Sequence, residues 1–374
     1  MKLLALHYER FRNLNDVRLE AGERTTIAVG ENGQGKTNLL EGVFFLATLK
    51  ALRASRLSEL VAFGAASARV TGRFLLRGVV REIAVDIADG TRTAFVDGKR
   101  TSSLLDYFGG VSVVAFTPDD LGVVKGAPDE RRTLLDRAVF NRYPAYLGEN
   151  REYSRALKNR NRLLKDRAPV SHLAAWDETL SRAGARLWLR RREVLAEIAP
   201  RARAAFESIG RIPEQAQFAY ESGSVDATLF ASGSEAQLQA ALAAALDARL
   251  QRDTERGFTT AGPHADDVAI TVGGNAARSF ASQGQARALV LAWKVAEIEN
   301  LHAATGVLPL LLLDDVSSEL DPERNAFLMS YLAASGAQVL LTTTDAHLVK
   351  RAAHESALWY QVSKGQVSRM KTPV

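Results

Sequence analysis

Hydrophobic residues recur at nearly every second position over much of the first 118 residues, a pattern that predicts β-strands. The strand-like stretches are 2–11, 17–21, 25–30, 68–78 and 81–90. Asp-Gly pairs at 89–90 and 97–98 indicate hairpin turns, because such turns need positive φ at their central residues. One helix interrupts these strands after Gly35 and carries apolar residues at helical spacing. These residues are Leu39, Leu40, Val43, Phe44 and Ala47.

The pattern changes between Asp129 and about Arg203, where Arg, Leu and Ala dominate and turn residues are few. Four stretches there and just beyond predict amphipathic helices. They are 131–140, 153–166, 176–198 and 234–253. No heptad pattern persists along them, so a compact helical arm is expected rather than an extended coiled coil.

Strands and helices alternate again after residue 257. The predicted elements are a strand at 267–272, a helix from Gln285 to about His302, a buried strand at 308–315, a helix from Pro322 and a buried strand at 337–344. The expected fold is therefore α/β, with mixed sheets and flanking helices. We expect a head formed by 1–118 and 254–374, split in sequence by an inserted α-helical arm at 119–253.

Composition places the chain among ordinary globular proteins, with 374 residues, 47% hydrophobic and 24% charged. The most apolar run, at 307–316, is too short to cross a membrane, and the N-terminal stretch lacks the apolar segment of a signal peptide. There are no cysteines, which excludes disulfides, thiolate metal sites and cysteine nucleophiles and fits a cytoplasmic location. The net charge of +5 is compatible with a nucleic-acid partner.

Residues 30–37 match the phosphate-binding pattern G-x-x-x-x-G-K-[ST] between a predicted strand and a predicted helix. The backbone N–H groups of such a loop cradle phosphates, and the helix dipole adds to the attraction. The expected nucleotide ligands are Gly30, Glu31, Asn32, Gly33, Gln34, Gly35, Lys36 and Thr37. Lys36 is expected to neutralise the β/γ-phosphates of ATP, and the Thr37 hydroxyl to bind Mg²⁺. The alternative is a chance match in a glycine-rich turn, which the strand–loop–helix context opposes.

Two aspartates, Asp314 and Asp315, follow four consecutive leucines at 310–313. A continuous apolar run is typical of a parallel strand buried on both faces, and ligands bind at the carboxyl ends of such strands. Asp314 is expected to hold Mg²⁺ through water, and Asp315 to orient or deprotonate an attacking water. The alternative is a strand that ends in a helix-capping aspartate.

A helix is predicted to begin at "SQGQAR", 282–287, where Ser282, Gly284 and Gln285 are small or polar. This start is either an ordinary N-cap made by Ser282 or a second contact to the nucleotide. The sequence by itself does not separate a contact within one chain from a contact between two chains.

These motifs, in this order, resemble the ABC-type ATPase head and, within that group, the RecF family of bacterial recombination and gap-repair proteins. The stretches that carry the resemblance are 11–14, 30–42, 116–136, 261–267, 282–287 and 310–321. The resemblance implies that two heads pair head to tail with ATP between them. Ser282, Gly284 and Gln285 would then contact the γ-phosphate held by the Lys36 loop of the other subunit.

Several positions depart from transporter-type ATPases. Thr344 stands where those enzymes have a switch histidine, and Asp315 replaces the usual glutamate. Asp119 and Asp120 stand at the expected glutamine. Ala265 departs from the resembled family itself, which usually has a basic residue at this position. We therefore expect Asp315, Lys36 and Thr344 to support only slow, DNA-stimulated ATP hydrolysis that acts as a release switch.

The arm is rich in cations, which suggests a surface that follows DNA phosphates without reading bases. The candidates are Arg131, Arg132, Arg151, Arg155, Lys158, Arg160, Arg162, Lys165, Arg190, Arg191 and Arg192. A solvated helix face gives the same pattern and is the alternative.

The resemblance also implies sequence-independent binding to gapped or duplex DNA in the response to DNA damage, including the SOS response. It implies the mediator proteins RecR and RecO as partners that help to load recombinase. A transporter ATPase subunit, an SMC-like structural head and a P-loop kinase are the competing interpretations. The arm and Thr344 argue against a transporter subunit. The lack of heptads argues against an SMC-like head. A P-loop kinase would have no need for a second contact to the γ-phosphate.

Overall fold

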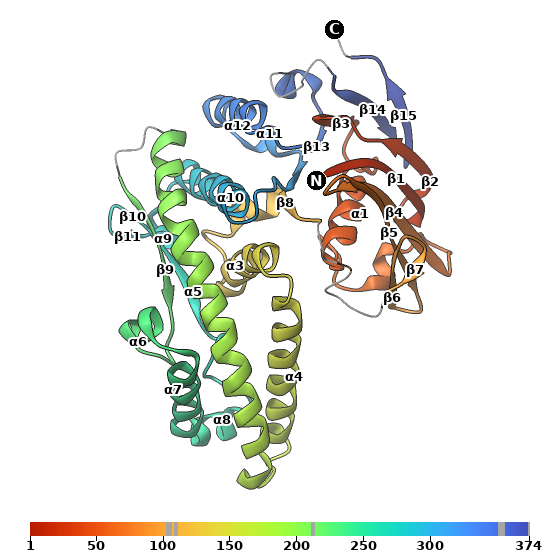
Figure 1. Cartoon of the computed structure of the whole chain (residues 1–374). Coiled ribbons are helices and arrows are strands. Elements are labelled where there is room, and N and C mark those ends of the chain that lie inside the picture. The colour runs from red at the N-terminus through yellow and green to blue at the C-terminus, as the bar shows by residue number, and fades with distance from the viewer. Residues whose placement is uncertain (102–106, 108–110, 211–213, 351–355, 373–374) are drawn as a thin grey trace. The chain divides into compact units, whose positions relative to one another are not determined.

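The computed structural model describes residues 1–101, 107, 111–210, 214–350 and 356–372 (Figure 1). They form two compact units: Met1–Leu121 together with Glu297–Val374, and Gly122–Ala296. No helix among the described residues is long and apolar enough to cross a membrane.

The first unit contains an antiparallel sheet in the order β2-β1-β4-β5-β6-β7. Its strands are β1 (Lys2–Phe11), β2 (Leu14–Glu20), β4 (Ser67–Leu76), β5 (Val79–Ala88), β6 (Thr91–Val96) and β7 (Lys99–Arg100). Both predicted Asp-Gly turns are confirmed, since Asp89 and Gly90 have φ of 50° and 66°, and Asp97 and Gly98 have φ of 50° and 74°.

A second six-stranded sheet in the same unit has the order β15-β14-β3-β13-β12-β8. Its strands are β3 (Thr25–Val29), β8 (Val113–Phe116), β12 (Leu310–Asp314), β13 (Val339–Thr343), β14 (Leu358–Ser363) and β15 (Gln366–Met370). All neighbours are parallel except β14 and β15, which form a hairpin at the edge. Every residue of β12 and β13 is buried, which explains their uninterrupted apolar sequence.

Helix α1 (Lys36–Thr48) contacts strands of both sheets and is buried from Leu39 to Thr48. The helix therefore carries the phosphate loop on the core of this unit. The unit also contains α11 (Val316–Glu319), α12 (Pro322–Ser335) and the 3₁₀ helices η1 (Leu57–Leu60), η2 (Pro118–Gly122) and η4 (Ala346–Val349).

The second unit is mainly helical. Its helices are α3 (Pro128–Arg142), α4 (Tyr146–Lys165), η3 (Val170–His172), α5 (Ala174–Gly210), α6 (Ala227–Ser232), α7 (Glu235–Ala248), α8 (Leu250–Arg256) and α9 (Ala277–Phe280). A small sheet, β11-β10-β9, is made of β9 (Ala216–Glu221), β10 (Asp267–Val272) and β11 (Asn275–Ala276). Helix α10 (Gln283–Thr305) begins in this unit.

Two boundaries differ from the sequence-based expectation. The second unit extends to Ala296, whereas the predicted arm ended at 253, because β10 pairs with β9 and the start of α10 packs in the same core through Trp293 and Phe218. Helix α5 continues through Pro200 to Gly210, because apolar residues beyond the proline are buried. These residues are Ala202, Ala205, Phe206 and Ile209. The division into a head and an arm stays a prediction about function.

Candidate functional site

The phosphate loop joins β3 to α1, as the sequence predicted. Lys36, at the first turn of α1, is only 5% exposed, and its Nζ donates to the carbonyls of Gly30 at 2.7 Å and Glu31 at 2.9 Å. Burial lowers the pKa of Lys36, while the negative charges of Asp315 and Asp314 oppose the shift. The ammonium group is therefore held inside the loop and close to both predicted carboxylates.

Thr37 and Asp314 are 277 positions apart in sequence, yet the Thr37 hydroxyl donates to Asp314 Oδ1 at 2.8 Å. The Thr342 hydroxyl from the neighbouring parallel strand β13 donates to the same oxygen at 2.9 Å. Mg²⁺ in nucleotide sites takes one or two carboxylate or hydroxyl oxygens from the protein and completes its shell with phosphate and water. Thr37 and Asp314 bring one hydroxyl and one carboxylate oxygen together beside the loop, a pair that fits this ion.

Asp315 leaves β12 in a left-handed conformation, with φ 49° and ψ 27°. Its N–H donates to the Thr342 carbonyl at 3.1 Å, and its Oδ1 accepts from the N–H of Thr344 at 3.4 Å. A non-glycine residue in this conformation is strained by about 1–2 kcal/mol, and such strain clusters at functional sites. The structure brings the Asp315 carboxylate and the Thr344 backbone together beside the phosphate loop, and the catalytic roles of the two side chains stay predictions.

Arg53 is a site residue that the sequence analysis missed. Its Nη2 donates to Asp314 Oδ2 at 2.7 Å, and its main-chain N–H donates to the buried Glu41 carboxylate at 3.1 Å. Arg53 lies between α1 and η1 in a stretch without hydrophobic periodicity, so no pattern pointed to it. The guanidinium neutralises the second oxygen of the carboxylate that fits Mg²⁺.

Of the two acids near the position of the expected glutamine, Asp119 approaches Arg53. Its Oδ2 lies 3.9 Å from Arg53 Nε, and its side chain is 79% exposed. Asp120 is buried and accepts from the N–H and the hydroxyl of Thr117 at 2.9 and 3.0 Å. Asp120 therefore fixes the local turn, whereas Asp119 remains accessible.

Ser282, Gly284 and Gln285 belong to the second unit and form the start of α10. The Ser282 Oγ accepts from the Gln285 N–H at 3.1 Å, and the Gln285 Oε1 accepts from the Ser282 N–H at 2.9 Å. This reciprocal capping box is the ordinary N-cap interpretation, and it uses the side chain of Gln285. Contact of these residues with a γ-phosphate stays a prediction, carried by the exposed Ser282 hydroxyl and the first turn of α10.

The prediction of DNA contact is wrong for three of the eleven arm cations, because their side chains are buried in ion pairs. Arg131 pairs with Asp267 at 2.8 Å, and Arg191 is bonded to Asp136 at 2.8 Å. Arg160 is fully buried and bonds Asp253 at 2.7 Å. Composition could not separate these residues from surface cations, since both kinds occur on amphipathic helices.

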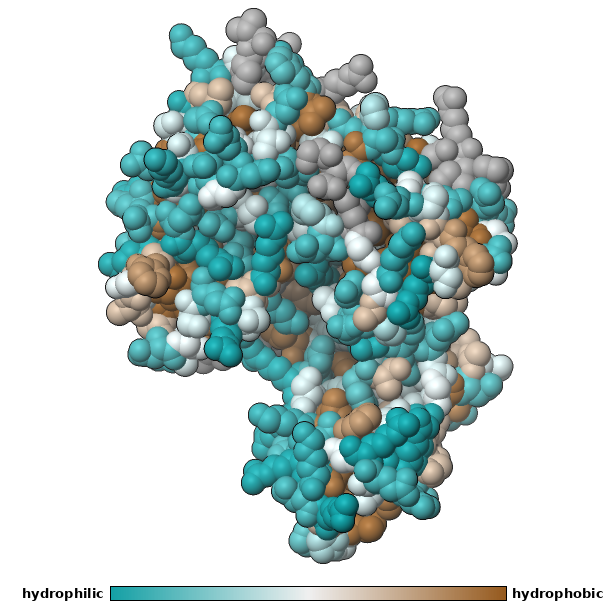
Figure 2. Space-filling view, turned by 180° about the vertical axis from the view of Figure 1, so that it is seen from behind, coloured by the Kyte–Doolittle hydropathy of each residue, from teal (hydrophilic) through white to brown (hydrophobic). Residues whose placement is uncertain are grey.

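Five other cations form one exposed stripe on α4. They are Arg151, Arg155, Lys158, Arg162 and Lys165, all exposed. Their spacing of four, three, four and three residues places them on one helix face over about 21 Å. Within the described residues only Arg162 of this set has an ion pair, with Asp166 at 3.8 Å. Hydrophilic side chains also cover much of the end of this unit where α4 ends and α5 begins (Figures 1 and 2).

Buried residues of the "GPHADD" stretch, 262–267, form hydrogen bonds within the second unit. His264 is largely buried, with Nδ1 2.6 Å from the Tyr153 hydroxyl and Nε2 3.0 Å from the Thr259 carbonyl. Burial lowers the pKa of His264. The adjacent Asp266 accepts from Trp188 and Tyr220, and burial raises the pKa of its carboxyl. Ala265 is exposed, so the missing basic side chain removes no internal contact of the unit.

Comparison with solved structures supports the fold. A structure described as the recombination mediator protein RecF-ATP in the RecFOR pathway matches with a TM-score of 0.88 and 29% identity, over 99% of this chain and 97% of that chain. A structure of an SMC head bound to a domain of ScpA matches with a TM-score of 0.57 and 16% identity, over 99% and 97% of the two chains, which shows a shared fold alone.

Comparison with sequences is more specific. The family model for the RecF/RecN/SMC N-terminal domain matches residues 2–368. The DNA replication and repair protein RecF of Myxococcus xanthus is 65% identical, over 98% of this chain and 97% of that protein. The protein of the same name from Geobacter sulfurreducens is 39% identical, over 98% and 100% of the two chains. The predicted resemblance is thus confirmed, a transporter subunit is not favoured, and the chain belongs to the RecF family of DNA replication and repair proteins.

Proposed function

We propose that the protein is an ATP-dependent DNA-binding clamp of recombinational gap repair and replication restart. Two copies would pair head to tail, each holding ATP in its Lys36 loop and presenting Ser282, Gly284 and Gln285 to the γ-phosphate of the other. The carrying observation is that Lys36, Thr37, Asp314 and Asp315 converge at the ends of parallel strands. A similar protein with ATP in its description adds support.

Each residue has a distinct role in this proposal. The loop N–H groups and Lys36 bind the phosphates, and Thr37 with Asp314 hold Mg²⁺, which would neutralise charge on the phosphate oxygens. Asp315 orients or deprotonates the attacking water, with its carboxylate steadied by the Thr344 N–H. The first turn of α10 offers N–H groups and positive potential to the γ-phosphate.

Hydrolysis is proposed to be slow and to act as a release switch. The Thr344 side chain can donate a hydrogen bond but carries no charge, and Asp315 is one methylene shorter than glutamate. Both features weaken stabilisation of the developing negative charge. DNA-stimulated turnover would then time the separation of the two copies.

The α4 stripe is the proposed DNA contact. Its cations bind phosphates without reading bases, so we propose sequence-independent binding to gapped or duplex DNA. Pairing of two copies would double the stripe and couple ATP occupancy to DNA affinity. RecR and RecO, and a role in loading recombinase, belong to the same proposal, which draws on the RecFOR pathway named for the solved relatives.

The proposal also assigns roles to the parts of the chain and a location to the protein. Residues 1–118 and 254–374 would act as the ATPase head and 119–253 as the arm, and the protein would act in the cytoplasm.

Sedimentation with and without ATP and gapped DNA tests the pairing. The wild type is expected to sediment as a dimer only with ATP. Lys36→Arg is expected to bind nucleotide and hydrolyse it poorly, whereas Ser282→Arg is expected to bind ATP as a monomer. A wild-type protein that stays monomeric with ATP on gapped DNA would contradict the clamp model. An ATP-dependent dimer of Ser282→Arg would show that the start of α10 is not part of the interface.

A further inference from the structure

The C-terminal hairpin β14–β15 touches the phosphate loop through its turn. Lys364 and Gly365 have φ of 48° and 78°, a two-residue turn in which both central residues are left-handed. The N–H of Lys364 donates to the Gln34 side-chain oxygen at 2.7 Å, and the N–H of Gly365 donates to the Gln34 carbonyl at 2.9 Å. The N–H groups of both central turn residues therefore donate to one residue of the phosphate loop, Gln34.

A second hairpin holds the same carbonyl. Asn13, in the turn between β1 and β2, donates from Nδ2 to the Gln34 carbonyl at 3.1 Å, and its Oδ1 accepts from Asn38 of α1 at 2.8 Å. The Gln34 carbonyl thus accepts two hydrogen bonds, which occupy both of its lone pairs. Its direction is set by two turns that are far apart in sequence.

Fixing this carbonyl fixes the next N–H as well. A trans peptide is planar, with its N–H opposite its C=O, so the N–H of Gly35 is directed away from the hairpins. Gly35 opens α1, and an N–H at this place in a phosphate loop is one of those that cradle the anion. The two turns therefore determine where a phosphate-binding donor points.

Hairpin β14–β15 approaches both the phosphate loop and the β1–β2 turn too closely for extra atoms. A Cβ on Gly365 would lie 2.0 Å from the Asn13 carbonyl oxygen, and a Cβ on Gly30 would lie 2.3 Å from the Val362 carbonyl oxygen of β14. Atoms do not approach this closely without a shift of backbone. The hairpin is consequently in close contact with Gly30 at the start of the loop, bonds Gln34 further along it, and packs on the β1–β2 turn at Asn13.

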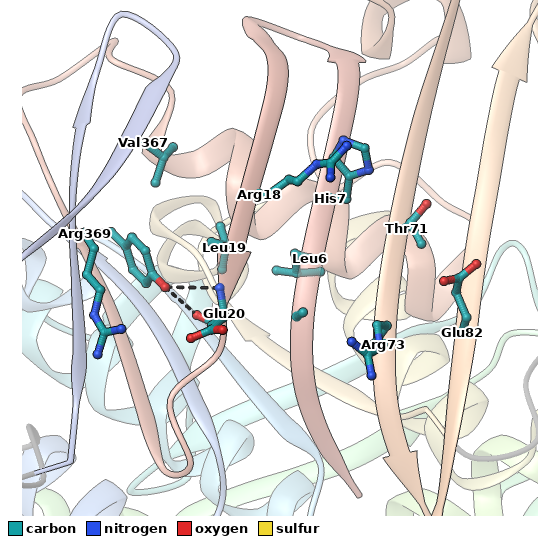
Figure 3. Close-up of a pocket in the computed structure, with 12 residues that line it drawn as sticks. Leu6, His7, Arg18, Leu19, Glu20, Thr71, Arg73, Glu82, Val367 and Arg369 are labelled. Atoms are coloured by element: carbon teal, nitrogen blue, oxygen red, sulfur yellow. Dashed lines mark hydrogen bonds between the residues drawn. The ribbon is translucent and has the colours of Figure 1, made fainter.

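The hairpin is also anchored away from the loop. The Tyr360 hydroxyl of β14 donates to the Glu20 carbonyl at 2.9 Å and accepts from the Glu20 N–H at 3.1 Å. Figure 3 draws these two bonds at Glu20 and shows Val367 and Arg369 of β15 beside Arg18 and Leu19 of β2, in one groove. The hairpin is therefore a braced element and not a loose end.

We propose that hairpin β14–β15 sets the phosphate loop in its binding conformation, with Gly365 and Gln34 as positioning residues. This proposal rests on the proposed binding of ATP. A displaced hairpin would release the Gln34 carbonyl, let the Gly35 N–H turn away and weaken the grip on phosphate. Asp314 ends β12 and Asp315 follows it, so neither belongs to the hairpin and both would keep their places.

The test is Gly365→Ala, with Gly98→Ala as its matched control. Gly98 occupies the same turn position in another hairpin, with φ 74°, and a Cβ there meets nothing within 4 Å. Both changes impose the same left-handed alanine, and Gly365→Ala adds the clash with the Asn13 carbonyl, so the melting temperature should fall in both variants and fall further in Gly365→Ala. Only Gly365→Ala should raise the Kd for a fluorescent ATP analogue, by about tenfold, and raise KM with kcat at saturating ATP unchanged.

A second variant keeps the test decisive if Gly365→Ala folds poorly. Gln34→Ala removes one of the two bonds to the turn, and it should raise the Kd by about threefold. Equal Kd values for wild type, Gly365→Ala and Gln34→Ala would overturn the proposal. A Kd that rises as much in Gly98→Ala as in Gly365→Ala would overturn it too. A wild type that fails to bind the analogue would instead refute the proposed nucleotide function.

Discussion

Arg53 Nη2 lies 2.7 Å from Asp314 Oδ2, so the carboxylate that fits Mg²⁺ already carries a positive partner. Oδ1 of the same carboxylate accepts from Thr37 and Thr342. A cation added at this site has to share Asp314 with the guanidinium. Arg53 thus has the geometry to adjust the affinity for the metal.

The first prediction concerns this competition. The Arg53 side chain is 39% exposed, so its pairing with Asp314 is screened and contributes only about 0.5–1 kcal/mol. Arg53→Ala should therefore lower the Mg²⁺ concentration needed for half-maximal ATP binding by about two- to fivefold. Arg56→Ala, an exposed neighbour, is the control. A higher Mg²⁺ requirement in Arg53→Ala would show that the guanidinium assists the nucleotide site instead.

The second prediction separates hydrolysis from binding at Asp315. Asp315→Asn keeps the shape of the side chain and its acceptor for the Thr344 N–H, but it cannot take a proton. Turnover should fall by at least about 100-fold while the Kd for ATP changes by less than about threefold. Single-turnover hydrolysis and analogue titration on the same preparation measure both quantities. Retained turnover would assign the activation of water to another group.

The third prediction concerns the α4 stripe. Reversing the charge of Arg155 and Lys158 together should reduce the slope of log K against log salt for duplex binding by about two. The matched single changes are Arg155→Glu and Arg203→Glu, since both are exposed helical arginines of the same unit. Arg203→Glu should leave the slope unchanged. Equal slopes for all variants would remove α4 as the DNA contact.

The sequence predicted the parts of the site that local patterns encode and missed those that depend on packing. The loop motif predicts Lys36 and Thr37 as site residues. Asp314 is predicted because it ends a buried parallel strand, and ligands bind at the carboxyl edge of such a sheet. Arg53 has no such signal, since its partner is 261 positions away and its own stretch has no period. Arg160 looks like any surface cation in sequence, and only the fold places it at 0% exposure.

The fourth prediction follows from that burial. Arg160 bonds Asp253 at 2.7 Å, Asp177 at 2.5 Å and Thr259 at 2.8 Å. Arg160→Ala would leave the fully buried Asp253 carboxylate without its guanidinium partner, so the free energy of unfolding should drop by about 3–5 kcal/mol. The double change Arg160→Met with Asp253→Leu should recover part of this loss. Urea unfolding of the wild type, Arg160→Ala and the double variant measures these free energies. An Arg160→Ala protein as stable as the wild type would contradict the buried pair.

The fifth prediction is a pH dependence from His264. Burial is the main cause that lowers the pKa of this imidazole below its usual 6.5, with the positive charges of Arg132 and Arg191 acting in the same direction. The unfolded chain therefore binds more protons than the folded one at pH values between the folded pKa and 6.5. The contribution of His264 to stability is complete above the unfolded pKa and is lost as the pH falls toward the folded pKa.

His264→Gln is the matched variant, because glutamine can both donate and accept hydrogen bonds but does not titrate. From about pH 7.5 to about pH 5.5 the free energy of unfolding should fall more steeply in the wild type than in His264→Gln. Other titrating groups, including Asp266, are present in both proteins, so the difference between the two curves isolates His264. Urea unfolding at several pH values gives the two curves, and parallel curves would mean that the imidazole gains its proton in the folded protein as easily as in the unfolded chain.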